Sequence, residues 1–268
     1  MNLSPLEARE VFHLEFLRGF TRVVKPLSFS LKGGTNLRLF FGSIRYSEDM
    51  DLDIAGLPIH EVSDRVMKML TAPALPSTLR TFGIERLEAP DLSKAKQTAT
   101  VQRFKVHLFT EAGLDLFTKV EFSRRGLEEP FRPEPVAATV VGRYRLAPLI
   151  VPHYLARAAI RQKVHALASR KQVEARDIFD LYTLSSQPEA ADPEVWSQIA
   201  VAQLTQAQER VFLVSYPEYR DKVVSFLGAE DQETHDSEAI WDEIRLRVEG
   251  LIAAGLKARQ DGKKGGGS

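Results

Sequence analysis

An alternation of acidic and apolar residues over positions 49–53 constrains the fold of this chain more than any other feature. Asp49, Asp51 and Asp53 are each separated by one apolar residue. Because alternate residues of a β-strand face the same side, about 6.6 Å apart, this segment predicts a strand with its carboxylates on one face. Such charges repel unless a cation lies among them, and oxygen ligands favour Mg²⁺ or Mn²⁺. An exposed face balanced by Lys or Arg on the next strand explains the same pattern.

A glycine-rich turn precedes the acidic strand. Residues 27–31 are short and apolar and predict a buried strand, after which Gly33, Gly34 and Thr35 open a short helix. Glycines let the backbone approach a phosphate closely, and the free N–H groups at a helix start favour an anion. Thr35 can cap that helix or donate its hydroxyl to a phosphate oxygen. Turn and strand together predict a phosphate-binding loop beside a metal site.

The rest of the chain divides into a β-rich middle and a helical second half. Strands are expected over 82–87, 98–109, 114–123 and 138–146, with a hairpin turn at 111–113. Helices are expected over 4–25, 35–41, 59–70, 150–168, 175–184, 193–208, 218–226 and 237–258. This order predicts an α+β fold, with a core over 1–148, a helical domain over 149–260 and a flexible tail or linker over 261–268.

Composition limits the classes of function. Lys and Arg together number 36, as do Asp and Glu, so binding of nucleic acid through overall positive charge is excluded. The segment 153–176 is locally basic, although a solvated helix face is the commoner explanation of such a run. No apolar run approaches the length of a membrane span, no secretory signal is seen and cysteine is absent, which together favour a cytoplasmic protein.

Two sequence blocks resemble a known family. Lys-Gly-Gly-Thr-Asn-Leu-Arg at 32–38 and Arg-Tyr-Ser-Glu-Asp-Met-Asp at 45–51 closely resemble the AbiEii/AbiGii abortive-infection toxins, to which the mycobacterial MenT toxins are related. That family falls within the DNA-polymerase-β-like nucleotidyltransferases, so the resemblance implies their core and mixed or antiparallel sheet. It makes Asp49 and Asp51 the metal pair. The spacing alone also permits Asp51 and Asp53.

The resemblance implies further site residues. The superfamily uses a third carboxylate on a neighbouring strand, for which Glu121 is the candidate and Asp115 a rival. A helical motif matches the family at Lys163, Arg170 and the Arg-Asp-Ile-Phe-Asp-Leu run at 176–181, and it gives catalytic roles to Lys163 and Asp177. By the same resemblance Gly33, Gly34, Thr35, Lys163 and Arg170 bind the nucleotide. Asp180 is expected to be structural.

The activity that the resemblance implies is transfer of a nucleotide from an NTP to the 3′ end of tRNA, which stops translation. Mg²⁺ or Mn²⁺ is the expected cofactor, and a cognate antitoxin the expected partner. The basic segment 157–176 could hold the RNA through phosphate contacts. One alternative is an enzyme of the same fold that modifies a protein or small molecule, and another is an inactive binding or regulatory module. The NTP, the acceptor, the antitoxin and the oligomeric state are left open by the sequence.

Overall fold

The computed structural model describes residues 3–93, 95–127 and 129–265, with side chains as far as 260. They form two compact units. The sheet unit contains the residues up to Phe40 together with Tyr46–Tyr154. The helical unit contains Phe41–Arg45 and the residues from Leu155 onward. A short loop between the glycine turn and the acidic strand therefore belongs to the helical unit, although both flanking segments belong to the sheet unit.

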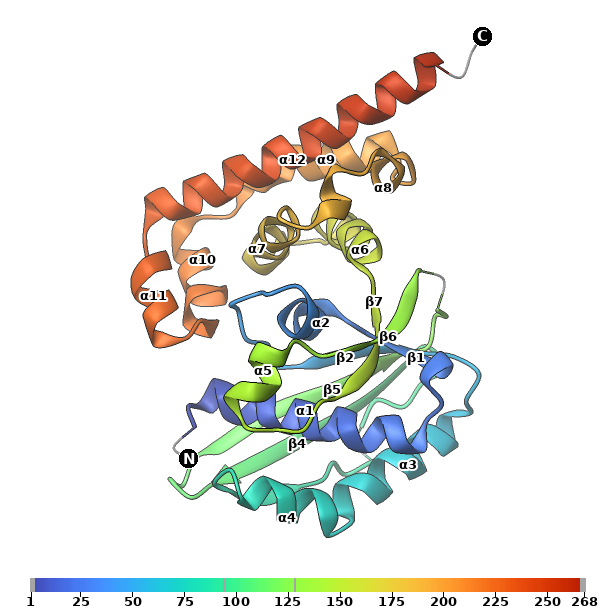
Figure 1. The fold of residues 1–268 in the computed structure, drawn as a ribbon, viewed down its shortest axis with the longest axis vertical. Helices are drawn as coiled ribbons and strands as arrows, with labels where there is room; N and C mark the ends of the chain where they lie inside the picture. Colours follow the sequence, from blue (N-terminus) through green and yellow to red (C-terminus); the bar gives the residue numbers. More distant parts are fainter. Residues whose placement is uncertain (1–2, 94, 128, 266–268) are drawn as a thin grey trace. The chain divides into compact units, whose positions relative to one another are not determined.

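A mixed β-sheet forms the centre of the sheet unit (Figure 1). Its seven strands, among the described residues, follow the order β3-β4-β5-β2-β1-β7-β6. β2 runs parallel to β5 and β1 runs parallel to β7, whereas the other neighbours are antiparallel. The strands are β1 (Phe29–Lys32), β2 (Met50–Ile54), β3 (Ile84–Glu88), β4 (Val101–Thr110), β5 (Asp115–Ser123), β6 (Phe131–Pro135) and β7 (Ile150–Tyr154). The glycine turn and the aspartates therefore meet in the middle of the sheet.

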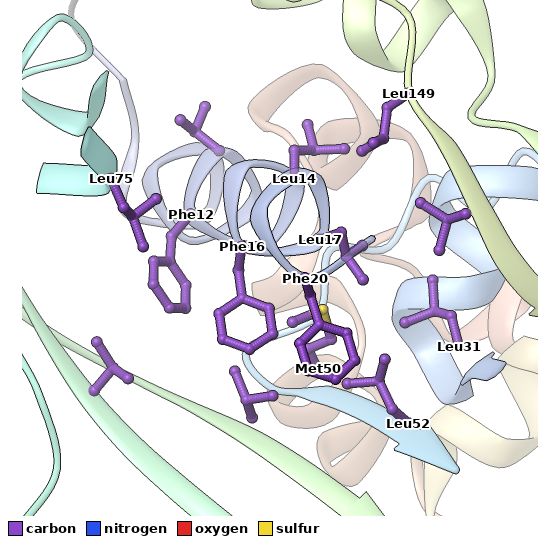
Figure 2. Close-up of a cluster of buried hydrophobic side chains, with 14 of the residues drawn as sticks. Phe12, Leu14, Phe16, Leu17, Phe20, Leu31, Met50, Leu52, Leu75 and Leu149 are labelled. Carbon is purple, nitrogen blue, oxygen red and sulfur yellow. The ribbon is translucent and has the colours of Figure 1, made fainter. Parts of the chain in front are cut away.

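Five α-helices belong to the described part of the sheet unit: α1 (Pro5–Val23), α2 (Gly33–Phe40), α3 (Ile59–Thr71), α4 (Ala74–Arg80) and α5 (Ala138–Arg143). Ser4 and Glu7 form the capping box that starts α1, as the sequence predicts. Phe12, Phe16 and Phe20 are fully buried and project from the same side of α1 (Figure 2). Their spacing of four residues gives α1 one apolar stripe, which it buries in the core of this unit.

The core holds the acidic strand in place from its opposite side. Met50, Leu52 and Ile54 are buried and belong to the same apolar cluster as α1. The Phe20 ring lies 5.2 Å from that of Phe122 on β5, centroid to centroid. Because alternate residues of a strand point to opposite faces, burial of these apolar side chains directs the aspartates of β2 to the other face.

The expected α+β fold is confirmed, with corrections to single elements. Residues 138–146, expected as a strand, begin with helix α5, because Val140, Val141 and Tyr144 bury at helical rather than alternating spacing. The expected helix over 150–168 begins instead with β7, since a short apolar run can be either element and this one completes the sheet beside β1. Sequence reasoning missed β6 and took the segment of α4 as loop. The hairpin turn at 111–113 is confirmed, with Gly113 at φ +76°.

Helices make up the second unit: α6 (Ala156–Ser169), α7 (Ala175–Leu184), α8 (Pro193–Ser197), α9 (Val201–Arg210), α10 (Tyr216–Lys222), α11 (Ala229–His235) and α12 (Glu238–Gly265). The long α12 packs against α7, α8 and α9. A Cβ added at Gly255 would lie 2.4 Å from the Trp196 ring, so only glycine allows this approach. The Trp241 ring stacks on Tyr219 at 4.4 Å.

Three further differences concern the helical unit. The helix expected over 193–208 is broken into α8 and α9, and α11 was not anticipated. The expected tail over 261–268 starts inside α12, and residues 266–268 lie outside the described residues. Within the described chain, no helix is both long and apolar enough to cross a membrane.

Candidate active site

The polar face of β2 brings the expected carboxylates next to one another. Asp51 lies opposite Lys32 on the antiparallel strand β1 and beside Glu121 on the parallel strand β5. Glu121 is therefore the acid on the neighbouring strand. Its rival Asp115 pairs with Phe109 at the far end of β5 and bonds to a histidine. The register thus assembles Asp51 and Glu121 from segments that are distant in the sequence.

Gly33 is placed against this carboxylate. Its φ of +70° lies in the left-handed region that glycine adopts without strain. A Cβ added there would lie only 3.1 Å from Oδ2 of Asp51. Both the backbone conformation and the contact therefore require glycine at the point where β1 ends and α2 begins. Helix α2 thus begins beside Asp51, and the N–H groups of a first helical turn lack partners within the helix.

Thr35 connects the glycine turn to the acidic strand. Its hydroxyl is buried and donates a hydrogen bond of 3.0 Å to the backbone oxygen of Asp49. The expected uses of this hydroxyl were a helix cap or a phosphate contact. Since its proton is directed to Asp49, Thr35 instead fixes the position at which Asp49 enters the cluster.

Each of three carboxylates in the cluster has a basic partner. The shortest nitrogen–oxygen distances are 2.8 Å for Lys119–Asp49, 2.6 Å for Arg103–Glu121 and 2.5 Å for Lys32–Asp53. From the sequence, a basic residue on the next strand was the alternative to a metal, and Lys119 was considered only as a surface partner of Glu121. In the structure Lys119 contacts Asp49, and Arg103 is the partner of Glu121. These pairs reduce the repulsion among the carboxylates of the acidic face.

Asp49 and Asp53 differ in how many of their carboxylate oxygens have a bonding partner. Both oxygens of Asp53 are taken, Oδ1 by Lys32 and Oδ2 by the Tyr154 hydroxyl at 2.7 Å. Asp49 keeps a buried Oδ1 that has no hydrogen-bond partner. Leaving a buried carboxylate oxygen unpaired is costly, so that atom is suited to a ligand. The geometry favours Asp49 over Asp53 as the partner of Asp51.

The electrostatics of the cluster centre on Asp51. Burial raises the pKa of its carboxyl above the ordinary value, and the negative charges of Glu121 and Asp49 add to the rise. The ammonium groups of Lys32 and Lys119 oppose it. The ionised form is therefore held at a cost that a nearby cation would reduce.

The donor set fits a hard divalent cation by its chemistry. Asp49, Asp51 and Glu121 offer only carboxylate oxygens, and one of them is the unpaired Oδ1 of Asp49. As the side chains stand, no group of three or more His, Asp or Glu among the described residues is arranged to hold a metal ion. The reason is that Asp49 and Glu121 are turned toward Lys119 and Arg103. Binding a cation would require these pairs to open.

A second charged cluster lies within the helical unit, between α6 and α7. Lys163 contacts both Asp177 and Asp180, at 3.0 and 2.6 Å. Arg170, just after α6, contacts Asp177 at 2.8 Å, and Arg45 contacts Asp180 at 2.9 Å. Lys163, Arg170 and Asp177 thus lie together, although Arg170 follows the last residue of α6 and does not share a helix face with Lys163. Arg45 was not named as a site residue, although it lies in a block that resembles the family.

Burial and charge act against each other in this cluster. Burial alone would lower the pKa of Lys163, but Asp180 and Asp177 outweigh it and raise the pKa. Burial alone would raise the pKa of Asp180, but Arg45 and Lys163 lower it. Asp177 lies in the first turn of α7, yet its carboxylate bonds to these cations rather than capping the helix. Lys163 and Asp180 are therefore both charged at neutral pH.

Comparison with known proteins was made on sequence and on fold. No curated protein sequence matches the chain. MenT4, a nucleotidyltransferase toxin from Mycobacterium tuberculosis H37Rv, is similar in structure with a TM-score of 0.66 and 19% identity, over 93% of this chain and 84% of that one. The protein JHP933 from Helicobacter pylori has a TM-score of 0.57 and 16% identity, over 99% and 97% of the two chains. At these identities the likeness shows a shared fold.

A match to a protein-family model shows the family to which the chain belongs. The model of the nucleotidyl transferase AbiEii toxin, type IV toxin–antitoxin system, matches residues 15–254. This range contains the glycine turn, the acidic strand, Glu121 and the α6–α7 cluster. The chain therefore belongs to the AbiEii family of nucleotidyltransferase toxins.

Proposed function

We propose that this toxin transfers a nucleotidyl group from an NTP to the 3′ end of an RNA, with tRNA as the acceptor, in a reaction that requires Mg²⁺ or Mn²⁺. The observation that carries the proposal is the position of Asp51, between the Gly33 turn and Glu121, with the unpaired Oδ1 of Asp49 nearby. The Gly33 turn would give the phosphates of the NTP access to the backbone, and the carboxylates of Asp49, Asp51 and Glu121 would supply oxygen ligands for a cation.

Each residue of the sheet unit has a separate task in this proposal. Asp49, Asp51 and Glu121 would hold the divalent cation, which supplies charge neutralisation and an activated hydroxyl when bound. Gly33 and Gly34 admit the β- and γ-phosphates because no side chain blocks the backbone N–H groups. Thr35 acts as a positioning residue, since its hydroxyl fixes the carbonyl of Asp49.

Lys163 and Arg170 are proposed to neutralise the triphosphate, and Asp177 to position both. The α6–α7 cluster sets three cations, Arg45, Lys163 and Arg170, against the two carboxylates Asp177 and Asp180. One positive charge is left in excess, and the Arg170 side chain is 41% exposed. An exposed guanidinium with excess charge behind it is suited to bind phosphate.

A labelled-nucleotide experiment tests the proposal. The protein is incubated with total RNA, Mg²⁺ and each NTP in turn, labelled either at the α- or the γ-phosphate. Transfer of the α-label to tRNA, without transfer of the γ-label, is expected, and a chelator should stop it. α-label on a protein or small molecule would replace the acceptor while keeping the chemistry. The absence of label from every acceptor would favour an inactive binding or regulatory module instead.

Lys163→Ala separates a nucleotide-binding role from a purely structural one. Loss of one charged phosphate contact should weaken NTP binding about ten- to hundredfold, or roughly 1.5–3 kcal/mol. Lys163→Arg keeps the charge and should recover part of the affinity. Unchanged NTP affinity with lower thermal stability would leave Lys163 as a structural cation between α6 and α7.

A further inference from the structure

The polar face of the sheet continues past the carboxylate cluster along β4 and β5. Apart from Thr110 at the hairpin, the even-numbered residues of both strands, such as Phe104, Val106 and Phe122, are buried. The odd-numbered residues point to the other face and keep part of their surface exposed. This open face carries basic and aromatic side chains rather than the plain polar residues of an ordinary solvated sheet. Its basic and aromatic members are Arg86 of β3, Arg103, Lys105, His107 and Phe109 of β4, and Phe117 and Lys119 of β5, and the acids Glu88, Asp115 and Glu121 share the face.

The register makes this face continuous with the candidate active site. Glu121, beside Asp51, pairs with Arg103, and Lys119, bonded to Asp49, pairs with Lys105. The following rows, farther from Asp51, pair Phe117 with His107 and then Asp115 with Phe109. From Arg103 to Phe109 the strand covers about 20 Å. Side chains along this path therefore lead to the carboxylates step by step.

The aromatic rings of the open face contact cations and each other. The Arg86 guanidinium lies 3.6 Å from the Phe109 ring centre, and the Lys105 ammonium lies 5.9 Å from that of Phe117. His107 meets Phe117 at 5.5 Å, edge to face. Arg86 keeps 57% of its side-chain surface exposed. The Arg86 plane is thus presented to solvent above Phe109, and the Phe117 ring is half-buried beside it, so a further planar group can stack on this surface.

The charges of this face limit what it can bind. Arg86 pairs with Glu88, and His107 bonds to Asp115, so neither adds an unpaired positive charge. Among the residues that the structure describes, Lys105 is exposed and makes no ion pair. A ligand held here would gain most from stacking and little from charge. That balance suits unpaired bases better than a duplex, whose bases are already stacked and whose backbone requires many cations.

We infer that the open face of β3, β4 and β5 binds the single-stranded 3′ end of the acceptor RNA and guides it to Asp49 and Asp51. One base stacks on the Arg86 plane, which Phe109 supports from below, and another on Phe117, while Lys105 contacts a phosphate. The inference rests on the proposed function, and it assigns acceptor binding to the sheet rather than to the basic segment 157–176.

Stacking is tested with a single-stranded RNA of roughly ten nucleotides that carries 2-aminopurine near its 3′ end. The wild-type protein should bind it and quench its fluorescence. Phe109→Leu keeps an apolar side chain but removes the ring, and it should weaken binding about 5- to 150-fold. Phe109→Tyr keeps the ring and should bind like the wild type. This pair of variants separates stacking from loss of folding.

The phosphate contact is tested through salt dependence. Lys105→Ala should reduce the slope of log affinity against log salt by about 0.7, the value for one contact to a single strand. Lys68→Ala is the matched control, because Lys68 is an exposed lysine of helix α3, which lies on the opposite side of the sheet. Ser63 of α3 bonds to Gln102, which is on the buried side of β4. That control should leave the slope unchanged.

NTP affinity, measured by calorimetry on the same proteins, distinguishes the inference from the function on which it rests. If Phe109→Leu and Lys105→Ala bind both NTP and RNA as tightly as the wild type does, the inference is overturned but the proposed function is not. Equal affinity for single-stranded and duplex RNA would also overturn it. The inference would fail as well if substitutions on this face weakened only the binding of a protein partner. Failure of the wild type to bind any NTP would instead contradict the proposed function.

Discussion

Asp51 is the side chain on which nucleotidyl transfer should depend most strictly. Asp51→Asn preserves the shape of the side chain but removes the charge beside Gly33 and Glu121. Transfer should fall by more than about a hundredfold, as expected for a lost metal ligand. The melting temperature should not fall, because the carboxylate is held at an electrostatic cost in the folded protein. Turnover at the wild-type rate would remove Asp51 from the site.

Asp53→Asn provides the matched control on the same strand. Its carboxylate is already bonded to Lys32 and Tyr154, so transfer should fall far less than in Asp51→Asn. Turnover of both variants is measured together with that of Asp49→Asn. An inactive Asp53→Asn beside an active Asp49→Asn would mean that the metal pair is Asp51 and Asp53.

The site could be predicted from sequence only where local spacing carries the information. Alternation alone put the aspartates on one face, and the glycines before Thr35 indicated a phosphate turn. The partners of those groups were not accessible in this way. Lys119 and Arg103 reach Asp49 and Glu121 through the register of strands that pair across long separations in sequence. Register depends on packing of the whole sheet, which no local pattern encodes.

Helices α6 and α7 are joined by the buried charges that contact Asp180. Removing one partner of a buried ion pair leaves the other uncompensated, so Asp180→Ala should lower the free energy of unfolding by about 3–5 kcal/mol. Arg176→Ala, also on α7, loses only an exposed pair at 3.7 Å and should cost less than about 0.5 kcal/mol. Denaturant unfolding compares the two. Similar stabilities for both variants would contradict a structural role for this cluster.

Helix α1 should make the sheet unit sensitive to acid through His13. Its imidazole is buried, bonds to Thr118 on β5 at 2.9 Å, and has a pKa lowered to about 3, mainly by burial and also by Arg9. Between that value and 6.5 the unfolded chain binds a proton that the folded protein does not. Stability is therefore lost as pH falls, by about 2 kcal/mol from pH 7 to pH 5.

His13→Gln can keep an N–H donor but does not titrate, so it isolates this effect. Its unfolding free energy should lose about 2 kcal/mol less than that of the wild type over the same range. Denaturant unfolding at both pH values provides the comparison. Equal losses in the two proteins would show that His13 does not cause the acid sensitivity.

Among the elements, long amphipathic segments were predictable and short apolar ones were not. The pattern of α1 repeats over several turns and has a capping box, so its helix was expected. Residues 150–154 are too short for periodicity to distinguish a strand from a helix start, and only the pairing of Leu31 with His153 decides it. Residues 138–143 have β-branched side chains, yet burial at helical spacing overrides that propensity.

For the whole molecule, the proposal predicts catalytic toxicity. Expression without an antitoxin should stop bacterial growth, and Asp49→Ala with Asp51→Ala should restore it. The formal net charge of zero makes arrest by indiscriminate binding to nucleic acid an unsuitable explanation. Growth curves of the two strains, at matched protein levels, provide the measurement. Arrest that persists in the double variant would indicate a binding effect rather than transfer.

Sequencing the 3′ ends of tRNA from the arrested cells tests the central claim most directly. Transfer at Asp49 and Asp51 predicts tRNAs that are longer at the 3′ end in cells that express the wild type. The same tRNAs should have normal ends in cells that express the double variant. Arrest by the wild type with every tRNA end unchanged would contradict tRNA as the acceptor, and lengthened ends in the double variant would contradict the site.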